Sequence, residues 1–279
     1  MKKVAILPNY LKDESICFAK KLSDYLRKKR CNVKILGEKD FPDKDDDVAV
    51  VLGGDGTILR ACKKFYDTDT LIFGINFGHM GYLTECLPDE AWEYVDKIVL
   101  GNYRVEKRMM IEAEVIRNEK IIHSFVALNE AVIYRAKLMK AFGMKISING
   151  RHTDTVLGDG VIIATPTGST SYNLTAGGPL LTPTSDNMVI TPIASKSFPQ
   201  SSLVVNGNDV IDVKVKIDGL YENIAFASLE VDADETFDVC DGDVVRIRRA
   251  KHEASIIRVG DRSFYQILRE KISKTDLDV

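Results

Sequence analysis

The sequence GGDGT at Gly53–Thr57 has the residue types and spacing needed to bind a phosphate group. It follows the apolar run Val48–Leu52 and opens a helical pattern that extends to Tyr66. Glycines let the backbone approach a ligand closely, and the first turn of a helix presents unpaired N–H groups. The pattern therefore predicts an anion site suited to phosphates, with a tight strand-to-helix turn capped by an Asp as the structural alternative.

Asp55 is an unusual residue inside such a phosphate site. Its carboxylate would repel a polyphosphate unless it binds magnesium or accepts a proton during the reaction. The motif contains neither the G-x-x-x-x-G-K-[ST] pattern nor the G-x-G-x-x-G pattern, so a Walker phosphate loop and a Rossmann dinucleotide turn are both excluded at this position.

A second glycine-rich stretch, residues 74–83, follows the apolar run Leu71–Ile75. Ligands of open α/β sheets bind outside the carboxyl ends of the strands. We therefore expect this loop at the same sheet edge as the GGDGT motif, although a purely structural loop would have the same composition.

Two adjacent polar residues, Asn129 and Glu130, interrupt the apolar β pattern from Ile121 to Tyr134. A carboxylate buried there needs a partner, because desolvating an unpaired charge is costly. The pair therefore favours a binding role. A bulge at a sheet edge is the structural alternative.

Hydroxyl side chains are dense from Thr165 to Tyr172, downstream of Gly158-Asp159-Gly160. These hydroxyls could hydrogen-bond a base and a ribose, and Tyr172 could stack on an adenine or close over a sugar. A polar turn held together by local Ser and Thr hydrogen bonds is the alternative.

The first hundred residues alternate strands and helices, which predicts a doubly wound parallel sheet that positions the first two motifs. The expected strands are Val4–Leu7, Asn32–Leu36, Val48–Leu52 and Leu71–Ile75, and the expected helices are Ser15–Lys29, Thr57–Tyr66 and Pro88–Leu100.

From about Tyr103 the pattern changes to alternating strands punctuated by turn pairs such as Asn149-Gly150. We expect a β-rich, sandwich-like domain over residues 101–262. A last helix, Ser263–Lys274, is expected to return to the first domain, which would comprise residues 1–100 with 263–279 packed against it. The expected strands are Arg108–Arg117, Ile121–Tyr134, Met144–Ile148, Val161–Thr165, Leu203–Val205, Val210–Ile217 and Val244–Arg249.

Composition excludes several classes of protein. The formal net charge is −3, from 38 Lys and Arg against 41 Asp and Glu, so no basic excess supports a nucleic-acid or membrane-surface partner. No apolar run approaches the ~18–20 residues that cross a bilayer. The five cysteines are scattered without a C-x-x-C pair, which fits a cytoplasmic location, and the four histidines have no metal-ligand spacing.

Taken together and in order, these motifs resemble the NAD kinase family over roughly residues 50–270. The GGDGT motif alone is shared with lipid kinases and phosphofructokinases, but the full set is more specific. The matching segments are Gly53–Thr57, residues 74–82, Asn129-Glu130, Gly158–Gly160, Thr165–Tyr172, Gly177–Pro179 and Phe264–Lys271.

The resemblance implies an enzyme that phosphorylates the adenosine ribose 2′-hydroxyl of NAD to give NADP. The site would lie between an α/β domain that binds the phosphate donor and a β-rich domain that binds NAD. Mg²⁺ or another divalent cation would accompany ATP, with other triphosphates and polyphosphate left open as donors. A homodimer or homotetramer is the implied assembly.

The resemblance also assigns roles to individual residues. Asp55 would be the general base, and the donor phosphates would contact Gly53, Gly54, Gly56 and Thr57. Contacts to NAD would come from Asp55, Gly56, Asn129, Glu130, Asp159, Thr167, Thr170, Ser171, Tyr172, Asn173, Leu174, Thr175 and Ala194.

The chemistry of these residues agrees with that assignment. Phosphoryl transfer depends mainly on positioning and charge stabilisation, which backbone N–H groups at Gly54, Gly56 and Thr57 can supply without a lysine. Asp55 can orient the hydroxyl and accept its proton late. The sequence does not separate this role from a contact of Asp55 with magnesium.

Three positions depart from the family pattern, and two alternatives stay open. Ser195-Lys196 replaces a common Pro-His pair, Ala233 follows Asp232 where Gly is usual, and Ser171 replaces an Ala. These departures bear on the contacts to NAD and on the preference between NAD and NADH. A lipid kinase would share only the first motif, and a non-catalytic dinucleotide sensor would not need Asp55.

Overall fold

The computed structural model describes residues 1–78, 81–136, 142–196, 201–217 and 227–275. The chain divides into two compact units, of which the first contains residues 1–107 and 254–279 and the second residues 108–253. The expected domain limits were residues 100 and 262. The observed boundaries differ from them, since residues 101–107 and 254–262 belong to the first unit. Each unit is described by itself.

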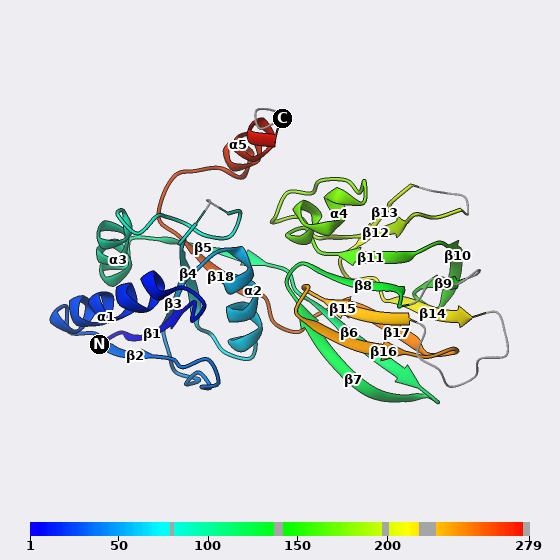
Figure 1. The fold of residues 1–279 in the computed structure, drawn as a ribbon, viewed down its shortest axis with the longest axis horizontal. Helices are drawn as coiled ribbons and strands as arrows, with labels where there is room; N and C mark the ends of the chain where they lie inside the picture. The colour runs from blue at the N-terminus through cyan, green and yellow to red at the C-terminus, as the bar shows by residue number, and fades with distance from the viewer. Residues whose placement is uncertain (79–80, 137–141, 197–200, 218–226, 276–279) are drawn as a thin grey trace. The chain divides into compact units, whose positions relative to one another are not determined.

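The first unit contains a six-stranded sheet in the order β2-β1-β3-β4-β18-β5 (Figure 1). The strand pairs β1–β2, β1–β3, β3–β4 and β4–β18 are parallel, as predicted for this sheet. Every residue of β3 is buried, which is why that strand is a continuous apolar run. The strands are β1 (Lys3–Pro8), β2 (Asn32–Ile35), β3 (Val48–Leu52), β4 (Leu71–Ile75), β5 (Arg104–Arg108) and β18 (Ala254–Arg258).

Three helices follow strands of this sheet: α1 (Asp13–Lys28), α2 (Asp55–Lys64) and α3 (Ala91–Leu100). α1 buries Ala19, Leu22 and Leu26, which share one helical face. Helix α3 begins three residues after Pro88, later than predicted, and ends at Gly101, whose φ of +84° stops the helix. A final helix, α5 (Phe264–Thr275), also belongs to the first unit.

The second unit consists of two antiparallel sheets, ordered β10-β9-β14-β17-β6-β7 and β13-β12-β11-β8-β15-β16 (Figure 1). A single hydrophobic cluster contains residues from both sheets, among them Val115, Ile133, Ile163 and Val213, so the sheets pack face to face as a sandwich. The strands are β6 (Ile111–Arg117), β7 (Lys120–Ala127), β8 (Glu130–Arg135), β9 (Phe142–Ile148), β10 (Arg151–Leu157), β11 (Gly160–Ala164), β12 (Asn187–Ile193), β13 (Leu203–Asn206), β14 (Ile211–Ile217), β15 (Ala227–Val231), β16 (Glu235–Val239) and β17 (Val244–Arg249).

Two predicted strands were wrong in their extent. The expected strand Ile121–Tyr134 is two strands, β7 and β8, which lie in different sheets. The expected strand Arg108–Arg117 likewise divides into the end of β5 and the whole of β6. In both cases the apolar pattern continues from one strand into the next although the chain moves to another sheet. The pattern does not reveal this change, because residues on both sides of it face a hydrophobic core.

Candidate active site

The GGDGT motif connects the end of β3 to the start of α2, as its sequence predicted. Gly53 lies so close to Thr57 that a Cβ on Gly53 would be 2.3 Å from the Thr57 hydroxyl oxygen, so only glycine fits. A Cβ on Gly54 or Gly56 would meet nothing within 4 Å. The helix N-terminus therefore faces open space at Gly54 and Gly56, where its unpaired N–H groups can receive an anion.

The second glycine-rich stretch lies against this motif and holds its aspartate. The half-buried carboxylate of Asp55 accepts hydrogen bonds from the backbone N–H of Tyr82 at 2.8 Å and of Leu83 at 3.0 Å. A Cβ on Gly81 would be 1.9 Å from an Asp55 oxygen, so the close approach requires glycine. His79 and Met80 of the same motif lie outside the described residues.

Arg258 fixes the backbone that holds Asp55, a role that sequence reasoning missed. Its guanidinium donates to the carbonyl oxygens of Leu83 and Tyr82 at 3.1 and 3.2 Å. It also pairs with Glu85 at 3.1 Å and with Glu106 at 3.1 Å. Arg258 lies on β18, the last strand of this sheet in chain order. This strand therefore holds in place the Tyr82-Leu83 backbone that binds the Asp55 carboxylate.

Tyr82 presents an aromatic ring next to the Asp55 carboxylate. Burial and the negative charge of Asp55 raise the pKa of the Tyr82 phenol, which stays neutral at physiological pH. The Lys271 ammonium lies 5.8 Å from the ring centre, and the Phe264 ring lies 6.3 Å from it. Both residues come from α5, so the predicted return of the last helix to the first unit places its side chains on Tyr82.

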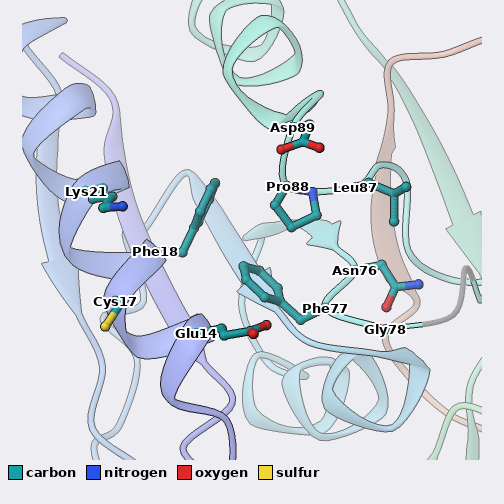
Figure 2. A pocket seen from close by; sticks show the side chains of 10 residues that line it. All are labelled: Glu14, Cys17, Phe18, Lys21, Asn76, Phe77, Gly78, Leu87, Pro88 and Asp89. Carbon is teal, nitrogen blue, oxygen red and sulfur yellow. The ribbon is translucent and has the colours of Figure 1, made fainter.

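A cavity of about 480 Å³ lies between α1 and the loops that follow β4 (Figure 2). Figure 2 shows α1 residues on one side of it and residues 76–78 and 87–89 on the other. The rings of Phe18 and Phe77 meet at 5.4 Å. The buried amide of Asn76 has no hydrogen-bond partner among the described residues. Asn76, Phe77 and Gly78 belong to the second glycine-rich stretch, but none of the residues predicted to contact NAD or the donor phosphates lines this cavity.

In the second unit, the chain passes from β7 to β8 through Leu128 and Asn129, and Glu130 begins β8. β8 pairs with β11 and β15, so Glu130 belongs to a central strand rather than to a sheet edge, where a bulge was the alternative. Thr165 fixes the turn from one side. Its backbone N–H donates to the Asn129 carbonyl at 2.8 Å, and its hydroxyl donates to the Leu128 carbonyl at 2.5 Å.

The Glu130 carboxyl is buried, with 4% of the residue exposed. Its Oε1 accepts a hydrogen bond from the Ser171 hydroxyl at 3.0 Å, whereas Oε2 has no partner among the described residues. The pKa of Glu130 is raised to about 8, first by burial and then by the charges of Asp232 and Glu230, with the Ser171 hydrogen bond opposing the rise. The carboxyl is therefore largely protonated at neutral pH and has one oxygen available to a ligand.

The hydroxyl-rich segment forms a short 3₁₀ turn, Gly168–Thr170, followed by the one-turn helix α4 (Tyr172–Thr175). The Thr167 hydroxyl accepts a hydrogen bond from Arg108 at 3.2 Å, and the Thr170 hydroxyl donates to the Thr167 carbonyl at 3.1 Å. Tyr172, Leu174 and Thr175 are exposed.

Asn173 differs from its neighbours because it is fully buried. Its amide donates to the carbonyls of Ser169 and Pro179 and accepts the Thr191 hydroxyl at 2.6 Å. These bonds use the side chain to hold the segment together, as in the structural alternative considered above.

A second cavity, of about 390 Å³, brings Tyr172 together with Asp159. Asp159 forms an ion pair with Arg135 at 2.9 Å. Ala194 has a left-handed φ of +45° and follows Ile193, which also lines the cavity. Sequence reasoning missed the side chains that β8 and β15 contribute, because their alternation resembles any half-buried strand. The lining residues are Val132, Tyr134, Arg135, Asp159, Tyr172, Ile193 and Glu230.

The predicted site residues thus form one group in each unit. Gly53–Thr57 belong to the first unit, and all predicted residues from Asn129 onward belong to the second. Among the described residues, no group of three or more His, Cys, Asp or Glu side chains could hold a metal ion. Among the same residues, no helix is long and apolar enough to span a membrane.

Comparison with known proteins assigns both units to one family. The ATP-NAD kinase N-terminal domain model matches residues 27–103, and the ATP-NAD kinase C-terminal domain model matches residues 128–259. An NAD kinase of Natranaerobius thermophilus is 31% identical over 286 residues, which cover 98% of each chain. An NAD kinase of Thermoanaerobacter pseudethanolicus is 34% identical over 287 residues, which cover 98% of this chain and 100% of the relative.

Two solved structures have the same fold. A yeast NADH kinase complexed with NADH has a TM-score of 0.82 at 20% identity, covering 100% of this chain and 88% of that one. An NAD kinase from Archaeoglobus fulgidus in complex with ATP has a TM-score of 0.76 at 25% identity, covering 98% of this chain and 99% of that one.

Proposed function

This chain belongs to the NAD kinase family, whose members phosphorylate the adenosine ribose 2′-hydroxyl of NAD to give NADP. We propose the roles that its residues have in this reaction. Asp55 acts as the general base on that hydroxyl. The observation that carries this proposal is the pair of backbone hydrogen bonds from Tyr82 and Leu83, which fix the orientation of the carboxylate. Each oxygen accepts one N–H and keeps a further lone pair for the hydroxyl proton.

The donor phosphates bind the N-terminus of α2, where Gly54 and Gly56 supply backbone N–H groups. Gly53 and Thr57 belong to the same loop, but their N–H groups already donate to the carbonyl oxygens of Ile75 and Gly54 at 2.9 Å, so the expected N–H contacts from these two residues are not part of the proposal. The open space beside Gly54 and Gly56 supports this role. ATP is the proposed donor, and Mg²⁺ enters with it as part of the substrate, neutralising charge on the phosphates.

NAD binds the second unit, and its ribose hydroxyls contact Asn129 and Glu130. The buried Glu130 Oε2 has no partner within the part of the chain that the structure describes, which supports this contact, since a sugar hydroxyl would satisfy it. The nicotinamide end of NAD contacts Asp159, and Tyr172 stacks on a ring. Further contacts to NAD come from Gly56, Thr167, Thr170, Ser171, Asn173, Leu174, Thr175 and Ala194.

The second cavity supports an acceptor with flat rings and a diphosphate. Its volume of about 390 Å³ suits part of a dinucleotide, and its walls combine tyrosine rings with carboxylates and an arginine. A homodimer or homotetramer and a cytoplasmic location remain predictions.

The proposal is tested with a coupled assay of purified protein, NAD, ATP and Mg²⁺, in which an NADP-specific dehydrogenase detects the product. Formation of NADP that is lost in Asp55→Asn, with NAD binding retained, supports Asp55 as the base. The matched control is Asp46→Asn, a buried aspartate of the same unit that accepts the Asp43 N–H at 3.1 Å and should leave turnover intact. Unchanged turnover in Asp55→Asn contradicts the proposal.

A further inference from the structure

Asp232 lies beneath the turn that carries Asn129 and Glu130, although about 100 residues separate them in the sequence. Its carboxylate accepts hydrogen bonds from three consecutive backbone N–H groups, those of Leu128 at 2.9 Å, Asn129 at 2.8 Å and Glu130 at 3.2 Å. Its own N–H donates to the Glu130 carbonyl at 3.1 Å. Asp232 is 5% exposed, so these bonds form away from solvent.

The backbone at Asp232 adopts a conformation that side chains other than glycine rarely take. Asp232 and Ala233 have φ values of +52° and +53°. Aspartate tolerates the left-handed region better than most residues, but two such residues in succession still cost energy. This unfavourable backbone conformation in the turn after β15 directs the Asp232 carboxylate at the three N–H groups.

The two faces of the Leu128–Glu130 turn are therefore held by different partners. Thr165 satisfies carbonyl oxygens of the turn, and Asp232 satisfies its N–H groups. Hydrogen bonds to an ionised acceptor are shorter and stronger than neutral ones, so Asp232 contributes a large share of the rigidity. Removing it would leave three N–H groups without this acceptor and let the turn move.

We propose that Asp232 is a positioning residue of the acceptor site, which fixes the turn that presents Asn129 and Glu130 to NAD. The inference rests on the proposed role of that pair in NAD binding. Asp232 acts through these two residues rather than by touching NAD. Its loss should therefore weaken the use of NAD and leave the use of ATP nearly unchanged.

Asp232 also acts on Glu130 through its charge. The charged and polar groups that face Glu130 are Asp232 and Glu230, from β15 and the turn after it, and Ser171, from the start of α4. The two carboxylates raise the pKa of Glu130, and the Ser171 hydrogen bond lowers it. Asp232→Asn should therefore lower the pKa of Glu130, and Ser171→Ala should raise it.

The first experiment compares Asp232→Ala and Asp232→Asn with the unaltered chain in steady-state assays that vary NAD and ATP separately. We expect kcat/KM for NAD to fall by about tenfold or more in Asp232→Ala, while KM for ATP stays within about twofold, because hydrogen bonds to a charged group are lost only at the acceptor site. Asp232→Asn should lose less, since its amide oxygen still accepts two of the three N–H groups.

The matched control is Asp243→Asn, another buried aspartate in a turn of the second unit. The Asp243 carboxylate accepts the Cys240 N–H at 2.8 Å and pairs with Arg117 at 2.7 Å, but it belongs to no proposed site. This variant should lower the thermal midpoint without a selective loss of NAD use. Equal losses for NAD and ATP in the Asp232 variants, matching the control, would overturn the proposal.

The second experiment follows KM for NAD from about pH 6 to about pH 9, a range that contains the Glu130 titration. A sugar hydroxyl donates more strongly to an ionised carboxylate, so KM for NAD should fall as the pH rises through the pKa of Glu130. The midpoint should move to lower pH in Asp232→Asn and to higher pH in Ser171→Ala. A midpoint that stays in place in both variants would overturn the proposal.

The pH profile keeps the test decisive if Asp232→Ala does not fold, because Asp232→Asn and Ser171→Ala retain the size of the side chain or remove one hydroxyl. Failure of the proposed function and failure of this inference give different results. If the proposed function is wrong, the unaltered chain forms no NADP. If only this inference is wrong, the unaltered chain is active and the Asp232 variants use NAD as well as it does.

Discussion

Asp55 in the first unit and Asp232 in the second both accept hydrogen bonds from consecutive backbone N–H groups, but their surroundings differ. Asp55 begins a helix, is half-buried and receives two N–H groups from a separate loop. Asp232 is buried and receives three N–H groups from the turn beneath which it lies. The same interaction orients the half-buried carboxylate that we propose as the general base, and it holds the backbone in place where the carboxylate is buried.

Glu130 extends this comparison to a third carboxyl group. Its burial and the nearby charges of Asp232 and Glu230 raise its pKa to about 8, against the opposing effect of its one hydroxyl donor, Ser171. Backbone N–H groups stabilise the ionised form of a carboxylate, and burial without them favours the neutral acid. Among the described residues, no backbone N–H donates to the Glu130 side chain, and burial raises its pKa.

The largest expected effect tests whether Asp55 is the reactive carboxylate. Asp55→Asn keeps an oxygen for one backbone N–H but removes the base, so kcat should fall by about 10²–10⁴-fold. Isothermal titration calorimetry should show NAD binding within about threefold of the unaltered chain, a span of ~0.7 kcal/mol. A loss confined to NAD binding would instead make Asp55 a second bracing residue like Asp232.

Glu130→Gln should change how stability depends on pH. The pKa of Glu130 is raised from 4.5 to about 8, so between these values the folded state holds a proton that the unfolded state releases. Stability from this group is therefore present at low pH and declines as the pH rises towards 8, by about 1.4 kcal/mol for each unit of pKa difference.

Because glutamine resembles the neutral acid, Glu130→Gln should be stabilised relative to the unaltered chain by a growing amount from pH 5 to pH 8, a change of a few kcal/mol at most. Urea unfolding at several pH values measures this difference. Parallel stability curves for the two proteins would contradict the raised pKa of Glu130 and would mean that its carboxyl group is ionised at neutral pH.

Gly81→Ala should disturb Asp55 without touching the second unit. The added Cβ would be 1.9 Å from an Asp55 oxygen, so the carboxylate must move away from Tyr82 and Leu83. A misplacement of about 1 Å can reduce turnover by ~10–100-fold. Steady-state kinetics should show the loss in kcat with NAD affinity retained, and a normal kcat would mean that the orientation of Asp55 is unimportant.

The smallest expected effect separates two glycines of the GGDGT motif. Gly53→Ala places a Cβ 2.3 Å from the Thr57 hydroxyl and should destabilise the protein by about 1–3 kcal/mol. Gly56→Ala meets nothing within 4 Å, so it should leave the thermal midpoint unchanged or raised, and weaken ATP binding by filling the proposed phosphate space. Equal midpoints for the two variants would contradict this distinction.

Sequence reasoning succeeded for strands whose apolar pattern is regular, whether one face or both faces of the strand are buried. The bounds of β3, β4 and β17 agree with those predicted, because each is a continuous or regularly alternating apolar run. It missed the edge strands β10 and β16, which are rich in polar residues and have a single buried residue each. It also missed β5 and the interior strands β12, β15 and β18. An edge strand is defined by its pairing partner, which its own residues do not reveal.

The candidate site divides in the same way. Asp55 and Glu130 were identifiable because a carboxylate is out of place in a phosphate loop or an apolar strand. The contacts of Asp232 and Arg258 with those regions connect residues more than 100 positions apart, and no local pattern records them. Asn173 shows the converse, since a residue inside a recognisable motif uses its amide to hold the motif together.

The position of Arg258 also sets an order of assembly during synthesis. The loop that orients Asp55 is made early, but the arginine that holds its carbonyl oxygens lies on β18, after the whole second unit. Domains made first generally fold first on the ribosome, yet this one receives its final strand almost last. The proposed catalytic carboxylate therefore gains its full support only when the chain is nearly complete, and a chain truncated before residue 254 would lack it.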